Sequence, residues 1–179
     1  MNLDFISKMN TSNFYTYQPD ILGNGYQQLT LNFADDYDGK VVATLVRKKA
    51  AQATKKAVLY VHGFTDYFFQ KEMAEQFNQH GYDFYALDLR KYGRSKLPHQ
   101  TLYYVRDLRE YDAEISKSLE IISQENHNQV LLAGHSTGGL ITTLYAAHYP
   151  DHRLVKALWA NSPFYDFFKS IIEKKVGIP

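Results

Sequence analysis

The chain contains no cysteine, and this absence removes three classes of chemistry at once. Disulfide bridges, thiolate metal sites and cysteine nucleophiles are all excluded. Long apolar runs are missing too: no stretch approaches the roughly 20 residues that a membrane-spanning helix needs. The first twenty residues also lack a continuous apolar core of signal-peptide length. The sequence therefore predicts a soluble, cytoplasmic protein without stable membrane insertion.

An excess of charge of one sign is lacking as well. The 20 Lys and Arg residues face 19 Asp and Glu residues, which leaves a net charge of +1. Binding to nucleic acid or to an acidic membrane surface favours a clustered basic excess, so we expect no nucleic-acid partner. The short basic cluster Arg47–Lys49, followed by Lys55 and Lys56, is interpreted as a solvated loop between strands.

The composition that remains is that of a globular domain. A chain of 179 residues, 45% hydrophobic and 22% charged, is long enough and apolar enough for one domain with a real core. Its 15 Tyr and 11 Phe fit core packing as well as a cleft lined by rings. No metal or nucleotide cofactor is indicated, because the glycine-rich stretch "GHSTGG" lacks the spacing and the lysine of a phosphate loop.

The first part of the chain, residues 1–56, has the alternation that is typical of antiparallel strands. Asn13–Gln18 and Tyr26–Phe33 place aromatic and β-branched residues at every second position. The polar stretch Ala34–Lys40 contains Asp38-Gly39, a hairpin signal, and Lys40–Lys48 is predicted to be the next strand.

From residue 57 the pattern changes to short apolar runs separated by helical stretches. Four runs of this kind, separated by helices, favour parallel βαβ units covered on both faces over residues 57–163. Ligands of such sheets bind at the carboxyl ends of the strands. The runs are Ala57–Gly63, Tyr82–Leu89, Gln129–Gly134 and Arg153–Pro163. Helices are predicted near 70–80, 108–122 and 137–148. The second helix is expected to bury one stripe, made up of Leu108, Tyr111, Ile115, Leu119 and Ile122.

A serine stands at one of these strand ends, inside the pentapeptide Gly134-His135-Ser136-Thr137-Gly138. A serine hydroxyl is a poor nucleophile until a base removes its proton and donors stabilise the oxyanion. Small residues on both sides allow a sharp strand-to-helix turn that lifts the hydroxyl from the backbone, and the helix N-terminus directs N–H groups at the developing charge. The alternative is a serine that only caps the helix; the position between a predicted strand and a predicted helix favours a nucleophile.

A second strand end supplies a partner for this serine. The run that ends in His62-Gly63 leaves the N–H of Phe64 free to point into a cleft. Together with the N–H of Thr137 it would form an oxyanion hole with two donors. His62 is interpreted as a residue that braces the loop rather than as the base.

Three motifs in order resemble the α/β-hydrolase superfamily: "HGF" after one strand, "DLRKYGRS" after the next and "GHSTGG" after the third. The resemblance covers roughly residues 26–164 and is to the serine-hydrolase branch with monoacylglycerol lipases, lysophospholipases and serine aminopeptidases. It implies a mostly parallel sheet with antiparallel N-terminal strands and helices on both faces. It also implies that Ser136 is the nucleophile and that the loop 88–95 shapes the turn beside the site. The implied oxyanion hole is Phe64 and Thr137, supported by His62, Gly63, Gly134, His135 and Gly138.

The rest of the catalytic machinery is not found in this sequence. In the resembled family the order is serine, acid, histidine. Only His148 and His152 follow the serine: the first lies about 18 Å along the helix, and the second is expected at the opposite end of the sheet. Asp166 is weighed as the acid, but a capping or loop role is preferred. By the resemblance, residues 164–179 begin a cap, and the chain is the N-terminal part of a longer hydrolase that is inactive by itself.

Three functions remain open. The leading one is hydrolysis of carboxylic esters with a small ester or acyl substrate, for which aromatic residues near the strand ends are weak support. An aminopeptidase or amidase is the near alternative, with Asp66 as a group for the substrate amine, and a non-catalytic binding module is the other. A sheet without its last strands would also self-associate or pair with the missing C-terminal segment. The aromatic residues in question are Phe64, Tyr67, Phe68, Phe69, Tyr103, Tyr104, Phe164 and Tyr165.

Overall fold

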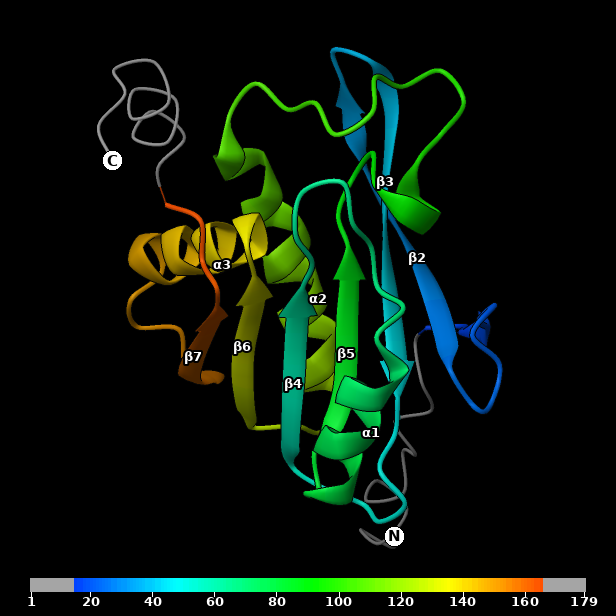
Figure 1. Cartoon of the computed structure of the whole chain (residues 1–179), viewed down its shortest axis with the longest axis vertical. Coiled ribbons are helices and arrows are strands. Elements are labelled where there is room, and N and C mark those ends of the chain that lie inside the picture. Colours follow the sequence, from blue (N-terminus) through cyan, green and yellow to red (C-terminus); the bar gives the residue numbers. More distant parts are fainter. Residues whose placement is uncertain (1–14, 166–179) are drawn as a thin grey trace, which may run out of the picture.

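The computed structural model describes residues 15–165, which form one mixed seven-stranded sheet with helices on both faces (Figure 1). The strand order is β1-β2-β3-β5-β4-β6-β7. The strands are β1 (Gln18–Pro19), β2 (Gln27–Asp36), β3 (Gly39–Lys48), β4 (Lys56–Val61), β5 (Asp83–Asp88), β6 (Gln129–His135) and β7 (Val155–Asn161). The α-helices are α1 (Lys71–Gln79), α2 (Asp112–Gln124) and α3 (Thr137–His148), and two 3₁₀ turns are η2 (Gly93–Ser95) and η3 (Leu108–Tyr111).

The predicted fold class is confirmed. β4 pairs parallel with β5 and with β6, and β6 pairs parallel with β7. β3 pairs antiparallel with β2 on one side and with β5 on the other. The hairpin between β2 and β3 turns at Tyr37 and Asp38, as the Asp-Gly signal predicted. Within residues 15–165 no helix has the length and apolar content that a membrane crossing requires.

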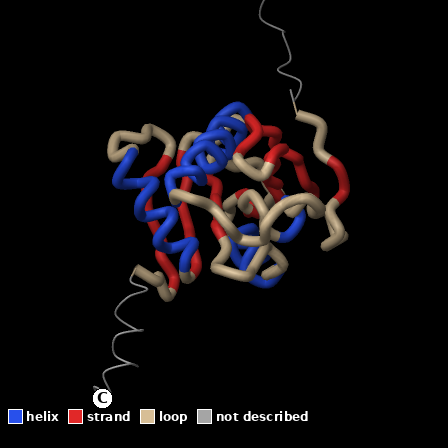
Figure 2. Tube along the Cα trace, turned by 90° about the horizontal axis from the view of Figure 1, so that it is seen from above, coloured by secondary structure: helices blue, strands red, loops and turns tan. Residues whose placement is uncertain are grey.

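The parallel strands read as continuous apolar runs because both of their faces are buried. Along β4, Val58 and Tyr60 pack toward α1, and Leu59 and Val61 pack toward α2 and α3. Figures 1 and 2 show these layers, with α1 on one face of the sheet and the other two helices on the opposite face. Parallel strands covered in this way bring their carboxyl ends to one edge, where Ser136 lies.

The expected first strand, Asn13–Gln18, is wrong over most of its length. Tyr15–Tyr17 are irregular, only Gln18 and Pro19 pair with β2, and residues 13 and 14 lie outside the described part. The side chain of Tyr17 is held by tertiary contacts instead. Its hydroxyl donates to Glu125 at 2.7 Å, and the Arg47 guanidinium lies 3.4 Å from the centre of its ring.

The interpretation of the basic cluster as a solvated loop is wrong for Arg47 and Lys48, whereas Lys49 and Lys55 lie outside the strands and are exposed. Arg47 and Lys48 belong to β3, and Arg47 is 9% exposed. Its guanidinium lies 2.7 Å from the carboxylate of Glu125, while the Lys49 ammonium lies 2.6 Å from Glu125 and 3.1 Å from Asp83. Carboxylates that are distant in sequence pair with both cations, and this pairing accompanies the burial of Arg47 but leaves the Lys49 side chain 38% exposed. Local charge patterning does not show these pairs.

The predicted long helix over 108–122 is two elements. The 3₁₀ turn η3 comes first, and α2 begins only at Asp112. Asp107 accepts a hydrogen bond from the Arg109 N–H at 2.9 Å, and Glu110 accepts from the Asp107 N–H at 3.2 Å, which is a capping box. Leu108 lies in this turn and is 37% exposed, so it does not belong to the buried stripe that Ile115 and Leu119 form.

Candidate active site

Ser136 occupies the sharp turn between β6 and α3. Its backbone angles, φ 53° and ψ −119°, are ones that residues with a side chain rarely adopt. Hydrogen bonds fix the turn on both sides. The Ser136 N–H donates to the carbonyl of Asn161 at 3.0 Å, and the Ser136 carbonyl accepts from the N–H groups of Gly139 at 2.9 Å and Phe164 at 3.1 Å. The surrounding backbone therefore holds the serine in a strained conformation.

The glycines around the serine are required by close backbone contacts. A Cβ added at Gly134 would lie 2.3 Å from the carbonyl oxygen of Gly138. A Cβ at Gly138 would lie 2.3 Å from the carbonyl oxygen of Val61, at the end of β4. Both distances are far below van der Waals contact, so only glycine allows α3 to start this close to the two central strands.

The loop after β4 runs directly beside the serine. A Cβ at Gly63 would be 3.3 Å from the Cβ of Ser136 and 3.3 Å from the Nδ1 of His135. His62 fixes this loop through both ring nitrogens. Its Nε2 accepts a hydrogen bond from the Leu89 N–H at 3.1 Å, so the proton of the neutral ring is on Nδ1. The Nδ1–H donates to the Gly63 carbonyl at 2.8 Å. Burial lowers the pKa of His62, which favours this neutral form.

The contact made by His62 also sets the direction of the next amide. The Gly63–Phe64 peptide bond is trans, so its carbonyl and its N–H point to opposite sides. Because the carbonyl faces His62, the Phe64 N–H points away from that ring. Within residues 15–165, neither this N–H nor that of Thr137 has a hydrogen-bond partner. Two unpaired donors thus come from the residues that follow Gly63 and Ser136.

Asp88, at the end of β5, is fully occupied by structural contacts. One carboxylate oxygen accepts from the Phe68 N–H at 2.9 Å, and the other accepts from the N–H and the guanidinium of Arg94 at 3.1 and 2.9 Å. Arg94 also holds Asp20 at 2.7 Å. In the same loop a Cβ on Gly93 would meet the Cβ of Tyr67 at 2.4 Å. The loop 88–95 is therefore held by structural contacts, and Asp88 is not free to act in catalysis.

Two further buried ion pairs hold the loop, and sequence reasoning did not identify them. Glu114 of α2 accepts a hydrogen bond from the Arg90 N–H at 2.9 Å and pairs with the Arg90 guanidinium. Burial raises the pKa of Glu114 to about 7, and Arg90 opposes that rise. The fully buried Lys91 ammonium lies 2.9 Å from both Asp36 and Asp38. The only signal in the sequence was the three basic residues of "DLRKYGRS".

The aromatic residues predicted near the strand ends divide into two groups. Phe64 is 52% exposed and meets the edge of Tyr103 at a centroid distance of 5.6 Å, which gives the loop beside the serine an apolar rim. Tyr67, Phe69, Tyr104 and Tyr165 are exposed as well. Phe68, in contrast, is fully buried against Phe84 and belongs to the core, which is the alternative that the composition left open, so it does not support an acyl substrate.

No base contacts the serine in the part of the chain that the structure describes. The Ser136 hydroxyl has no hydrogen-bond partner there. His148 lies at the far end of α3 with its Nδ1 2.7 Å from Asp112, and His152 accepts from the Leu154 N–H at 3.3 Å just before β7. Asp166, weighed above as the acid, lies outside the described residues.

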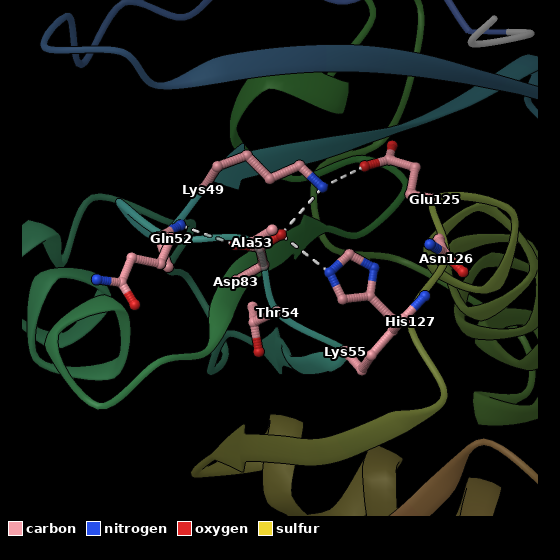
Figure 3. Close-up of a pocket in the computed structure, with 10 residues that line it drawn as sticks. Lys49, Gln52, Ala53, Thr54, Lys55, Asp83, Glu125, Asn126 and His127 are labelled. Atoms are coloured by element: carbon pink, nitrogen blue, oxygen red, sulfur yellow. Dashed lines mark hydrogen bonds and ion pairs between the residues drawn. The ribbon is translucent and has the colours of Figure 1, made fainter. Parts of the chain in front are cut away.

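A polar cavity of about 420 Å³ lies at the opposite, amino end of the parallel strands (Figure 3). Its charged groups pair with one another: the Asp83 carboxylate lies 2.9 Å from the Nε2 of His127 and 3.1 Å from the Lys49 ammonium, which also contacts Glu125. This cavity joins β3, β5 and the end of α2, and it is distant from Ser136 because β5 begins at Asp83.

Known proteins resemble the chain both in sequence and in fold. A family model described as serine aminopeptidase, S33, matches residues 52–173. Epoxide hydrolase 4 of Mus musculus is 30% identical over 125 residues, which are 69% of this chain and 33% of that protein. Probable lysophospholipase L2 of Haemophilus influenzae is 31% identical over 115 residues, 63% of this chain and 36% of that protein.

A solved structure adds the comparison of folds. The crystal structure of a probable hydrolytic enzyme from Pseudomonas aeruginosa PAO1 has a TM-score of 0.65 and 20% identity, and the match covers 93% of this chain and 47% of that one. At this identity the likeness shows the fold alone. The present chain spans about a third of the length of the two curated relatives above, at 33% and 36%.

Proposed function

Because the chain belongs to the serine aminopeptidase S33 family of α/β-hydrolases, we propose that it provides the nucleophile of a serine hydrolase that cleaves carboxylic esters. The observation that carries the proposal is the strained turn at Ser136, flanked by the unpaired amides of Phe64 and Thr137. A helix cap needs neither the strain nor the second amide. The relative that is named a probable lysophospholipase supports an ester substrate.

In the proposed reaction the Ser136 hydroxyl loses its proton to a base and attacks the ester carbonyl carbon. The carbonyl oxygen becomes an oxyanion that accepts hydrogen bonds from the Phe64 and Thr137 amides. Collapse of this intermediate breaks the ester C–O bond, the alcohol leaves with a proton, and an acyl-Ser136 ester remains until water hydrolyses it. The acid and the histidine of the triad lie beyond residue 179 in this proposal.

Chemical rescue tests this division of roles. The chain is incubated with a fluorophosphonate, which phosphonylates activated serines, and the rate is measured as imidazole is added. Without imidazole, labelling should be slower than in an intact triad by a factor on the order of 10⁶. With imidazole as an external base, the rate should rise in proportion to its concentration, and mass spectrometry should locate the label on Ser136.

Two variants make the experiment specific. Ser136→Ala should abolish the rescued labelling. Ser162→Ala should leave it unchanged, because Ser162 is an exposed serine at the next strand end that also has a positive φ of 45°. Labelling that is indifferent to imidazole, or that survives Ser136→Ala, would rule out the nucleophile. Rapid labelling without imidazole would show that the chain already contains its base.

An aminopeptidase or amidase is the second candidate, and it is favoured by the name of the matching family. Asp66 lies in the loop beside Gly63 and is half-buried. Its carboxylate accepts from the Tyr67 N–H at 2.8 Å and from the Gln70 side chain at 3.4 Å, and it remains able to hold a substrate ammonium. If the chain is an aminopeptidase, an amino-acid ester should acylate Ser136 faster than the matching uncharged ester when imidazole is present. Asp66→Asn should then remove this difference in rate. Equal rates for the two esters would exclude the aminopeptidase.

A further inference from the structure

Backbone strain within residues 15–165 gathers at one end of the sheet. Apart from asparagine, which tolerates the left-handed region, five residues other than glycine have a positive φ in this part of the chain. All five lie in the segments that follow the carboxyl ends of β4, β5, β6 and β7, and strain of this kind is typical of functional sites. They are Thr65, Lys91, Tyr103, Ser136 and Ser162. Tyr103 carries the largest ring among them, so its φ of 61° needs a physical reason.

The backbone of Tyr103 is held by a second strained residue. Its N–H donates to the carbonyl of Lys91 at 3.4 Å, and Lys91 itself has a φ of 66°. The buried Lys91 ammonium lies 2.9 Å from both Asp36 and Asp38. Asp38 also accepts a hydrogen bond from the Thr101 N–H at 3.3 Å. Figure 1 shows the loop between β5 and α2 passing the hairpin that supplies these carboxylates, so the hairpin fixes the place of Tyr103.

The ring of Tyr103 completes a closed set of contacts around one peptide bond. Its centroid lies 4.8 Å from that of Tyr92 and 5.6 Å from that of Phe64. The ring of Tyr92 in turn lies 4.7 Å from the imidazole of His62, which donates to the Gly63 carbonyl. His62 thus holds the carbonyl of the Gly63–Phe64 peptide, and Tyr103 holds the side chain that follows its N–H. The peptide is therefore fixed from both of its ends.

We propose that Tyr103 is a positioning residue, which keeps the Phe64 N–H directed at the oxyanion while Ser136 is acylated. The inference rests on the proposed function, and it assigns a role to a residue that acts through Phe64. What an oxyanion donor contributes depends on its direction, so a ring that prevents rotation of the peptide preserves that contribution. An ordinary negative φ at Tyr103 would move its ring out of this contact, which gives the strain its reason.

A readout that follows the oxyanion donors separates this role from simple packing. An ester and its thionoester differ in one atom: the carbonyl oxygen is replaced by sulfur, which is a weak hydrogen-bond acceptor. The donors therefore accelerate the ester more than the thionoester. With imidazole as the external base, acylation of Ser136 is followed by mass spectrometry for both compounds. The ratio of the two rates reports the donors, because a change in the folded fraction of the protein scales both rates equally.

Two substitutions of the same residue test the ring. Tyr103→Gly removes it and leaves the backbone conformation available, because glycine adopts a φ of 61° freely. The ratio of ester to thionoester rates should then fall about tenfold. Tyr103→Phe keeps the ring and should keep the ratio, since the Tyr103 hydroxyl has no hydrogen-bond partner within residues 15–165.

A matched control loses the same kind of ring far from the serine. Tyr149 also packs on a buried tyrosine, Tyr145, at a centroid distance of 4.7 Å, but it lies at the far end of α3 from Ser136. Tyr149→Gly should therefore keep the ratio of the unaltered chain.

The outcomes distinguish this inference from the function on which it rests. An unchanged ratio in Tyr103→Gly overturns the role of Tyr103 even if both rates fall, because the loss is then structural, and Ser136 remains the nucleophile. A ratio that also falls in Tyr103→Phe or in Tyr149→Gly overturns that role too. If imidazole allows neither compound to acylate Ser136 in the unaltered chain, the proposed function itself fails, and this inference falls with it.

Discussion

The strain at Ser136 can be measured by comparing two substitutions of the same residue. Ser136→Ala keeps the Cβ and therefore keeps the conflict with φ 53° and ψ −119°. Ser136→Gly removes the Cβ, and glycine adopts these angles freely. The hydroxyl has no hydrogen-bond partner in the described residues, so its loss in either variant should change stability little. The difference between the variants then isolates the backbone term.

The expected size follows from two opposing effects. A residue held in a sparsely populated backbone region costs about 1–3 kcal/mol. Glycine also increases the conformational entropy of the unfolded chain, which takes back about 0.4–1 kcal/mol. Ser136→Gly should therefore have a free energy of unfolding roughly 0.5–2 kcal/mol above that of Ser136→Ala.

Urea unfolding followed by circular dichroism measures this difference. Asn126→Gly serves as the matched control: its φ is 74°, but asparagine adopts the left-handed region readily, so the gain there should be smaller. A Ser136→Gly variant that is no more stable than Ser136→Ala would refute the reasoning. The turn would then store no strain, and the main argument for a nucleophile would be lost.

Two further variants test the packing and the charges described above. Gly138→Ala should lower the free energy of unfolding by about 3 kcal/mol or more, since its Cβ would meet the Val61 carbonyl at 2.3 Å. The control is Gly23→Ala, because nothing lies within 4 Å of a Cβ at Gly23, and in urea unfolding it should cost less stability. Equal losses of stability in the two variants would contradict the contact. For Asp83, burial raises the pKa, but hydrogen bonds from His127 and the Ala50 N–H, with the Lys49 ammonium, outweigh it and hold the pKa below its ordinary 3.8. The native state then binds this proton less readily than the unfolded chain, so the stabilisation is complete above about pH 4 and is lost as the pH falls through the lowered pKa. Unfolding measured from pH 2 to 6 should show a flatter decline for Asp83→Asn, and parallel curves would disprove the assignment.

The parallel core and the serine turn could be predicted because their signals are local. Strands buried on both faces appear as short apolar runs. The close approach of α3 to β6 demands glycine at 134, and its close approach to β4 demands glycine at 138. The position of the serine between a run and a helix follows directly from the order of those signals.

The features that could not be predicted depend on partners far away in sequence. Arg47 is buried because Glu125, at the end of α2, lies 2.7 Å from it. Lys91 is buried because Asp36 and Asp38 come from the hairpin between β2 and β3. Neither pairing leaves a mark in the neighbouring residues, so local patterning assigned these cations to solvent or to a turn.

The protonation state of one buried ring has a consequence for any titration of the reaction. His62 donates through one nitrogen and accepts through the other, and burial lowers its pKa further. A second proton would displace the Leu89 amide, so the imidazole stays uncharged through the neutral range and the Phe64 amide keeps its direction. If Ser136 is acylated as proposed, the dependence of that step on pH should therefore report the group that takes the serine proton, and the two proposed oxyanion donors should not contribute to it.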